Sequence, residues 1–364
     1  MPRPSAPALA LLLLASACGD GTSATTSAST DTTAASTSAA STSAASGTTG
    51  EPTTTDAPTT TAATTTDAST GVATTGDTAS TGASTGGEVL CAALPPGPLT
   101  AELLWTGYTG SEDLAFDGAG GLALKKDGQL VLVSSDQQEA VLAVGLPQVY
   151  GTRVALDGKI LLALPQQGKL QGVDADNNVL DLVTGLDSPN GVYVDPTGDV
   201  WLTDFGGARV VRYTPDWKPV EIVSGPDAAT ANGIVFDPLR GLLFFTNYAA
   251  GRLLRMPIVD GAPSGPPEPV GEIMGAKLDG LALDGCGNAY AVDQGNSRLY
   301  RFFLDGDGVA LAAPELLAEF PDNVANAQFG RGPGFDADTL YLSGNPGSVY
   351  RVVVGVEGAQ IGLP

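Results

Sequence analysis

Apolar and polar positions alternate in two short runs between residues 188 and 206. Residues 190–194 and 200–203 carry the apolar side chains, and the Asp-Pro-Thr-Gly segment between them has the composition of a tight turn. An alternation with a period of two residues is typical of a β-strand, whereas a helix would repeat about every 3.6 residues. We therefore predict two antiparallel strands joined by a turn.

This hairpin pattern recurs along the chain, and an aspartate in the turn aligns the copies. Five positions before that aspartate each copy has a polar residue, and a sixth copy keeps the polar residue without the aspartate; these residues are Glu112, Thr152, Asn190, Asn232, Asp279 and Asn326. Successive copies are 38 to 47 residues apart, which is the length of one four-stranded propeller blade. We predict an all-β fold, a six-bladed β-propeller with four-stranded blades.

The last copy is incomplete, because residues 355–364 are short and rich in glycine. Residues 99–105 form a strand-like segment ahead of the first copy, and we expect them to supply the missing outer strand and close the ring. Arginines recur in or beside the third strand of several copies. Because this motif repeats with the fold, we interpret it as arginine stems that pack over the blade surface rather than as a binding stripe.

The aspartates of the turns are interpreted as structural. A carboxylate in an Asp-Pro or Asp-Gly turn caps backbone N–H groups, and polar residues that end a second strand do the same. We assign this role to Asp117, Asp157, Asp195, Asp237, Asp284, Asp204, Asn247 and Asp293.

Composition divides the chain into three parts. Residues 19–88 consist almost entirely of Ser, Thr, Ala, Gly, Asp and Pro, and they contain no Lys, Arg or aromatic residue. Such a segment cannot bury enough apolar surface to offset the entropy of ordering it. We expect a signal peptide over residues 1–17, a modified Cys18 followed by a disordered tether up to residue 88, and the propeller over residues 89–364.

The N-terminus has the features of an export signal. Arg3 precedes a short apolar run over residues 8–17, which is too short to span a bilayer, and Cys18 follows small residues. The pattern resembles a bacterial lipoprotein signal, in which that thiol is acylated; an ordinary cleavage site after Ala17 is the alternative. We expect an exported protein whose Cys18 lipid anchors it to the cell envelope, at the outer membrane or the cell surface.

Charge and histidine content exclude several classes of function. The chain has 17 basic and 40 acidic residues, a formal net charge of −23, and no histidine. So acidic a chain repels a phosphate backbone, which excludes nucleic acid as a partner. Without histidine there is no Ser-His-Asp triad, no HExxH zinc site and no imidazole base. The remaining chemistry belongs to carboxylates, amides, hydroxyls or a hard metal ion.

Two cysteines lie in the predicted propeller. Cys91 is near its N-terminal edge, and Cys286 occupies the turn of the fifth copy. In an oxidising compartment they either pair, which would pin the N-terminal segment to one blade, or remain two unrelated thiols.

The first strands of the copies carry motifs with a specific resemblance. Residues 112–117 (Glu-Asp-Leu-Ala-Phe-Asp), 189–191 (Pro-Asn-Gly), 231–233 (Ala-Asn-Gly) and 279–281 (Asp-Gly-Leu) resemble those of the senescence marker protein, gluconolactonase and luciferin-regenerating enzyme family. The resemblance covers residues 100–354. It implies a six-bladed propeller with a divalent metal, usually calcium, in the central channel. By position it implies the ligands Glu112, Asn232 and Asp279, with Asn190 as a fourth ligand or a substrate contact.

The register of the copies supports the same site independently. It places the six polar residues at the start of the innermost strands, where they converge on one end of the channel. Two carboxylates with several amide oxygens suit a hard cation such as Ca²⁺. Alternatively, the Asn-Gly and Asp-Gly pairs are turn residues at strand entry, although Glu112 has no turn role. Around the metal we predict substrate contacts from Asn190, Thr152, Arg153 and Asn326.

Two functions from different classes follow. In the first, the protein is a calcium-dependent hydrolase of a lactone or related ester, in which Asp279 or Glu112 accepts the proton of the attacking water. In the second, it is a non-catalytic, calcium-stabilised surface module that binds a ligand or protein partner. The chain has Glu-Asp-Leu at 112–114 and Asn-Gly-Val at 190–192, where the family has Glu-Gly-Pro and Asn-Asp-Gly. These departures leave the substrate open.

Overall fold

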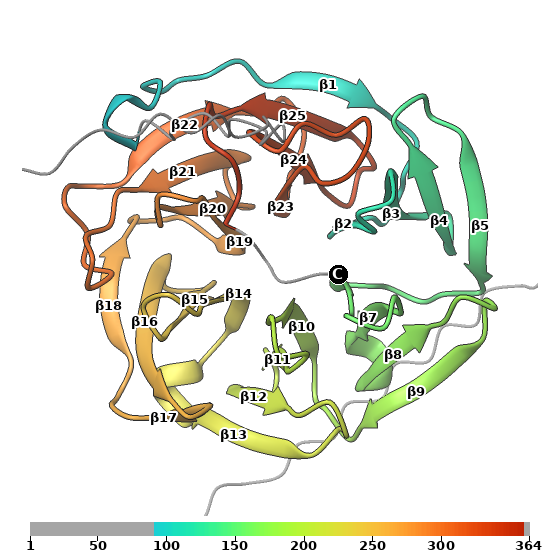
Figure 1. The fold of residues 1–364 in the computed structure, drawn as a ribbon, viewed down its shortest axis with the longest axis horizontal. Coiled ribbons are helices and arrows are strands. Elements are labelled where there is room, and N and C mark those ends of the chain that lie inside the picture. Colours follow the sequence, from blue (N-terminus) through green and yellow to red (C-terminus); the bar gives the residue numbers. More distant parts are fainter. Residues whose placement is uncertain (1–90, 360–364) are drawn as a thin grey trace, which may run out of the picture. The chain divides into compact units, whose positions relative to one another are not determined.

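The computed structural model describes residues 91–359, which form six antiparallel β-sheets around a central axis (Figure 1). In each sheet the strand nearest the axis comes first in the chain, apart from the contribution of β1 to the last sheet. The first three blades consist of β2 (Ala115–Phe116), β3 (Gly121–Lys126), β4 (Gln129–Ser134) and β5 (Glu139–Val144); β6 (Gly151–Val154), β7 (Ile160–Leu164), β8 (Lys169–Val173) and β9 (Val179–Thr184); and β10 (Pro189–Val194), β11 (Val200–Asp204), β12 (Arg209–Tyr213) and β13 (Pro219–Ser224).

The other three blades complete the ring. They consist of β14 (Ala231–Asp237), β15 (Leu242–Asn247), β16 (Arg252–Val259), β17 (Ala262–Pro263) and β18 (Glu268–Glu272); β19 (Leu278–Leu283), β20 (Ala289–Asp293), β21 (Arg298–Phe302) and β22 (Glu315–Glu319); and β23 (Asn326–Phe329), β24 (Thr339–Ser343), β25 (Val349–Val353) and β1 (Glu102–Trp105). The described residues also form three short 3₁₀ helices: η1 (Cys91–Ala93) precedes β1, η2 (Pro165–Gln167) joins β7 to β8, and η3 (Gly225–Ala228) joins the third blade to the fourth. The predicted six-bladed propeller is confirmed, with the short β17 as an addition to the fourth blade.

Burial decreases from the axis outward. Every residue of the inner strands β10 and β19 is buried, whereas the outer strand β9 has none that is fully buried. Both faces of an inner strand are covered by the neighbouring blades, so its apolar positions run almost without interruption. The hydrophobic core therefore lies between neighbouring blades. A few polar residues are also buried on the inner strands, and they are described below as the candidate site.

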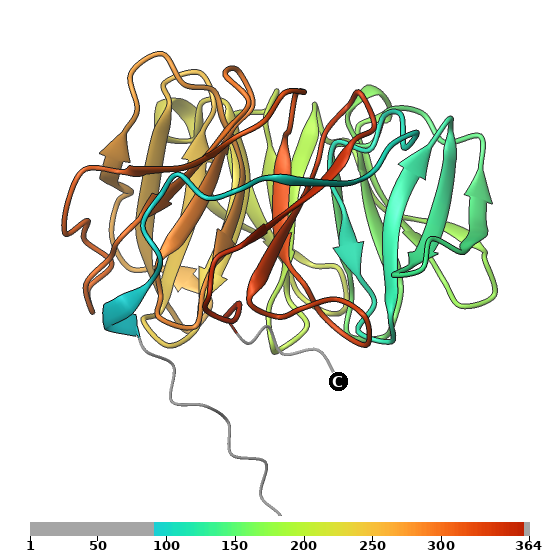
Figure 2. The same ribbon diagram turned by 90° about the horizontal axis from the view of Figure 1, so that it is seen from above.

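The N-terminal segment closes the ring as expected. Strand β1 pairs antiparallel with β25, with Glu102 opposite Arg351 and Leu103 opposite Tyr350. Figure 2 shows β1 running along the outer edge of this last blade. The expected strand at 99–105 is thus confirmed, although the paired part begins at Glu102.

The segment ahead of β1 is fixed to the fifth blade. Cys91 and Cys286 form a disulfide with their Cα atoms 5.6 Å apart, which decides between the two alternatives for these cysteines. The Arg301 guanidinium is completely buried, and its Nη2 donates to the Pro95 carbonyl at 2.8 Å and to Glu315 Oε2 at 2.6 Å. These contacts hold the first described residues on the outside of the ring.

The turn aspartates have the structural role predicted for them. Asp195 Oδ1 accepts from the backbone N–H groups of Thr197 and Asp199, and its Oδ2 accepts from Trp201 Nε1 at 2.9 Å. Asp284 caps its own turn in the same way.

The recurrent arginines are also structural. Their guanidinium groups form ion pairs with side chains of neighbouring strands, such as Arg252 with Glu272 at 2.8 Å. Within residues 91–359 no helix is long and apolar enough to cross a membrane.

Candidate functional site

The six polar residues of the repeat register occupy equivalent places around the axis. All are at most 5% exposed: Glu112, Thr152, Asn190, Asn232, Asp279 and Asn326. Five of them lie inside inner strands, at or near the strand start. Glu112 lies three residues before β2, in a segment where the Asp113 carboxylate accepts the Leu114 N–H at 2.8 Å. Their expected place at strand starts is therefore correct for five residues and wrong for Glu112.

The glycine after a site residue is required by close packing of inner strands. A Cβ on Gly191 would lie 2.1 Å from the Asn232 carbonyl oxygen, and one on Gly233 would lie 2.2 Å from that of Asp279. Neither glycine has a positive φ, and both lie within strands. The alternative interpretation of these pairs as turn residues is therefore wrong. Glycine allows each inner strand to touch the next.

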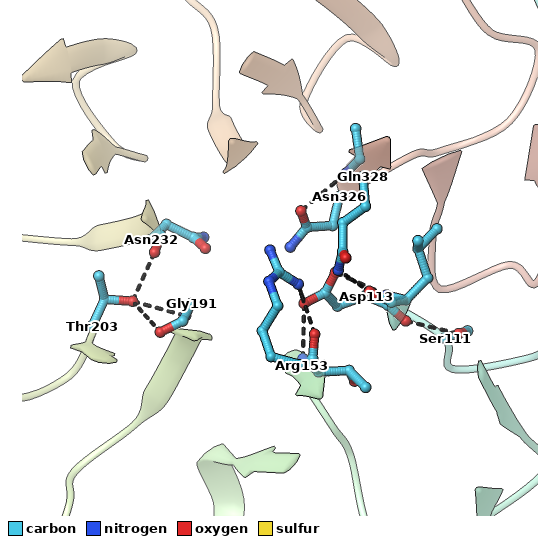
Figure 3. A network of polar contacts seen from close by, with 11 residues as sticks. Ser111, Asp113, Arg153, Gly191, Thr203, Asn232, Asn326 and Gln328 are labelled. Carbon is cyan, nitrogen blue, oxygen red and sulfur yellow. Dashed lines mark hydrogen bonds and ion pairs between the residues drawn. The ribbon is translucent and has the colours of Figure 1, made fainter. Parts of the chain in front are cut away.

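Threonines of the second strands fix the backbone of two site residues. Thr203 Oγ1 donates to the Asn232 carbonyl at 2.7 Å and accepts the Gly191 N–H at 2.8 Å (Figure 3). Thr246 repeats this arrangement one blade later, where its Oγ1 donates to the Asp279 carbonyl at 2.8 Å. Asn232 and Asp279 are thus positioned by the preceding blade.

The Glu112 and Asp279 carboxyls interact electrostatically across the channel. Burial raises the pKa of Glu112 to about 7, against a hydrogen bond from Asn345. Burial also raises the pKa of Asp279 well above its usual value, and the charges of Glu112 and Asp113 raise it further. Two carboxylates so placed repel one another, and a cation between them would relieve that repulsion.

The loop after β24 supplies a partner for Glu112 that sequence analysis missed. Asn345 Nδ2 donates to Glu112 Oε2 at 2.8 Å, across a sequence separation of 233 residues. No signal in the sequence identifies Asn345, because it lies outside the repeat register and approaches Glu112 only when the ring closes.

Asp113 is a second residue that the register does not single out. Its side chain is fully buried, and its Oδ2 accepts from Arg153 Nη1 and from the Thr152 N–H at 2.7 and 2.8 Å (Figure 3). Burial raises the pKa of the Asp113 carboxyl, and the positive charge of Arg153 offsets part of that rise. This ion pair joins the segment before β2 in the first blade to β6 in the second.

Three buried side-chain oxygens near this end have no hydrogen-bond partner within residues 91–359: Asn232 Oδ1, Asp279 Oδ2 and Ser343 Oγ, the last on β24 opposite Asn326. A buried acceptor without a donor costs about 1–3 kcal/mol, and a cation satisfies it. An amide oxygen, an aspartate and a glutamate are oxygen donors of the kind that Ca²⁺ takes, so the residues fit such an ion. The described chain has no group of three or more His, Cys, Asp or Glu side chains suited to a metal, so an ion at this end would also need amide oxygens as ligands.

Two tyrosines border the carboxylates. Burial raises the pKa of both Tyr150 and Tyr248, and the charges of Glu112 and Asp279 raise each further. Tyr248 also donates to Gln294 Oε1 at 2.8 Å. Tyr150 lies directly before β6, and Tyr248 lies directly after β15. The sequence analysis considered neither residue.

The predicted substrate contacts lie in different settings. Asn190 and Thr152 are buried at the register position, and Asn326 Oδ1 accepts the Ala327 N–H at 2.9 Å. Arg153 pairs with Asp113 and borders a cavity at the other end of the channel. Substrate contact by these four residues stays a prediction. The predicted lipidation site, Cys18, lies outside the described residues.

Comparisons with known proteins agree with this architecture. A model of the NHL repeat matches residues 186–213. No curated protein sequence matches the chain. Regucalcin, a calcium-binding protein from Agrobacterium tumefaciens, is 20% identical, with 73% of this chain and 97% of that chain covered and a TM-score of 0.59. A gluconolactonase from Xanthomonas campestris is 19% identical over 70% and 89% of the two chains, also with a TM-score of 0.59.

A luciferin-regenerating enzyme gives the same TM-score of 0.59, with 18% identity and coverage of 73% of this chain and 99% of that chain. These proteins are six-bladed β-propellers, as this chain is. The expected resemblance in fold is therefore confirmed.

Proposed function

We propose that the protein is a metal-dependent hydrolase of a lactone or a related ester, with Ca²⁺ as the metal. The observation that carries the proposal is the pair of interacting buried carboxyls, Glu112 and Asp279, in which Asp279 Oδ2 has no hydrogen-bond donor and neither has the Asn232 side-chain oxygen. Glu112, Asn232 and Asp279 would hold the ion, with Asn190 as a further oxygen donor. The likeness to a gluconolactonase and to a calcium-binding protein supports the same choice.

The chain's own residues have separate tasks in this reaction. When bound, a calcium ion polarises the ester carbonyl and lowers the pKa of a water molecule. Asp279 or Glu112 accepts the proton of the attacking water, since the chain has no histidine to do so. Asn345 orients Glu112 through its hydrogen bond, and Thr246 fixes the Asp279 backbone.

Hydrolysis of D-glucono-1,5-lactone tests the proposal. We expect activity in calcium, loss in chelator and recovery when calcium returns. Glu112→Gln and Asp279→Asn should each lower kcat/KM by about 100-fold or more, because each removes a metal ligand and a proton acceptor. Glu221→Gln on β13 and Asp216→Asn in the β12–β13 hairpin are matched controls and should retain full activity. Equal activity of wild type in chelator and in calcium would contradict the proposal.

The alternative function is a non-catalytic propeller that calcium stabilises. The burial of the site favours it, since Glu112 is 5% exposed and Asp279 only 2%. A substrate carbonyl must reach these groups, whereas an ion needs far less room. Calcium-dependent stabilisation without turnover of any lactone tested would support this alternative.

We also propose that the protein is exported and anchored to the bacterial envelope through a lipid on Cys18. The disulfide between Cys91 and Cys286 supports export, because disulfides form and persist in oxidising compartments.

Replacing Cys18 tests the anchor directly. Wild type is expected in the detergent phase of a Triton X-114 partition, and Cys18→Ser in the aqueous phase or unprocessed. Mass spectrometry of the mature N-terminus should show the acyl chains. The control is Ser16→Ala, which keeps the thiol and a small residue before it. A Cys18→Ser variant that partitions like wild type would contradict the lipid anchor.

A further inference from the structure

The channel end opposite Glu112 contains a cavity of about 460 Å³. All six blades contribute inner-strand residues to its wall; one from each blade is Phe116, Val154, Tyr193, Phe236, Leu281 and Phe329. These residues lie on the side away from the site residues that begin the strands. The cavity therefore lies on the axis, and its wall is mainly apolar.

Aromatic rings of this wall are held by neighbours outside the cavity. Phe236 stacks on Trp201 with ring centroids 5.0 Å apart. Phe116 meets Phe335 edge to face, also at 5.0 Å. Because the rings are packed on their outer sides, the apolar wall is preformed. A group that covers such a wall is stabilised there when it is itself apolar.

The charged side chains of the wall already have partners within the protein. Arg240 Nη1 donates to Asp237 Oδ2 at 2.8 Å, and Arg153 Nη1 donates to Asp113 Oδ2 at 2.7 Å. Asp284 accepts N–H groups of its own turn. What the wall offers an occupant is therefore apolar contact and not an unpaired charge.

The C-terminal segment of the described chain reaches this cavity along β19. The Ala359 N–H donates to the Leu283 carbonyl at 2.9 Å, and Asp284 forms an antiparallel bridge with Gly358. Ala359 also borders the cavity and packs against the hydrophobic core. The last described residues are thus held at the cavity wall.

This pairing uses the edge of β19 that faces the axis. The Asp284 N–H points toward β20 and donates to the Asn288 carbonyl, so the preceding Leu283 carbonyl points to the opposite, inner edge. Strand β19 runs from the site end of the channel to the cavity. A chain antiparallel to β19 therefore runs inward from the cavity end, and continued pairing would place Ile361 opposite Leu281 of the wall.

The residues that follow alternate like a strand with one apolar face. The sequence continues as Gln-Ile-Gly-Leu-Pro over residues 360–364. Ala359, Ile361 and Leu363 are two positions apart, so in an extended chain they share a face, and Ala359 is already at the cavity wall. A segment attached at the wall also has a higher effective concentration there than a free ligand.

We propose that residues 360–364 occupy this cavity as an extension of the pairing with β19, with the Ile361 and Leu363 side chains against the apolar wall. The segment closes this end of the channel and covers apolar surface that water would otherwise contact. The proposal concerns the end opposite the candidate metal site, and it does not depend on metal binding or catalysis.

A neutral apolar probe, N-phenyl-1-naphthylamine, tests whether the cavity is occupied. We expect a chain that ends at Ala359 to bind about one probe, at least tenfold more tightly than wild type. The double variant Ile361→Asp/Leu363→Asp should bind the probe as the shortened chain does, because carboxylates are costly to bury in an apolar cavity. The matched control is Met274→Asp/Leu311→Asp, which changes two exposed apolar residues outside the cavity wall and should behave as wild type.

Thermal unfolding gives a second, independent measurement. Ile361→Ser and Leu363→Ser should each lower the melting temperature by a few degrees, because each removes an apolar side chain that is covered only in the folded state. Gln360→Ser, on the other face of the segment, should leave the melting temperature unchanged. The chain that ends at Ala359 should lose at least as much as either single variant.

Two results would overturn the proposal. If wild type binds the probe as tightly as the shortened chain, the cavity is open and takes small apolar molecules instead. If the Ile361 and Leu363 variants melt at the wild-type temperature, their side chains are not docked. Where neither wild type nor the shortened chain binds the probe, the melting temperatures of these point variants decide the matter alone.

Discussion

Cys286→Ser is expected to lower the free energy of unfolding by about 4–5 kcal/mol. The disulfide joins positions 195 residues apart, and a cross-link over so long a loop removes much conformational freedom from the unfolded chain. It also holds the N-terminal segment that supplies β1, the strand that closes the ring. Denaturant unfolding of wild type and variant, without reductant, measures the difference.

Matched variants distinguish loss of the bond from local damage at Cys286. Cys91→Ser, the double variant and reduced wild type should all lose the same stability, because all of them remove one bond. Cys18→Ser replaces the third cysteine and should leave the free energy of unfolding unchanged. A decrease below about 1 kcal/mol, or a large difference between the two single variants, would show that the bond contributes little to closing the ring.

Metal-depleted protein is expected to lose about 3 kcal/mol of stability between pH 4.5 and pH 7 through Glu112 alone. The folded pKa of Glu112 is raised from 4.5 to about 7, so the folded state holds a proton that the unfolded chain releases in this window. The stabilisation is therefore complete below pH 4.5 and is lost as the pH rises through 7. The raised pKa of Asp279 acts in the same direction. Unfolding curves in chelator across this range measure it.

Calcium should reverse this trend, because the ion replaces the protons and binds only the folded site. Its stabilising effect should grow from pH 4.5 to pH 7. Glu112→Gln should flatten the metal-free profile and remove most of the calcium response. The exposed Glu221→Gln, in contrast, should behave as wild type. A metal-free profile that is flat for wild type would contradict the raised pKa of the buried Glu112 carboxyl.

Sequence patterns predicted the blades well because their causes are local. Alternating residues and an Asp-capped turn, as in residues 190–203, form a hairpin whatever lies around it, and the repeat length then sets the number of blades. The segment at 99–105 was assigned to the last blade by the same reasoning, since an open edge strand needs a partner. The turn roles of Asp195 and Asp284 also depend only on neighbouring residues.

The sequence also set the register of the candidate site, because a strand position that recurs once per blade must face the axis each time. It could not set the contacts made around that axis. Asn345 reaches Glu112 from 233 residues away, and Arg153 pairs with Asp113 rather than standing free in the site. Neither contact follows from the repeat, since each depends on side-chain directions between adjacent blades.

For this protein, then, the sequence by itself determined the all-β class, the six blades, the strand that closes them and the ring of polar residues at one end of the channel. All of these arise from short-range periodicity and turn chemistry. The tertiary structure decided that Cys91 and Cys286 pair, that glycines such as Gly191 serve close packing instead of turns, and that a preformed cavity lies at the opposite end. These features depend on contacts between residues that are far apart in the chain, and no local pattern records the distances between them.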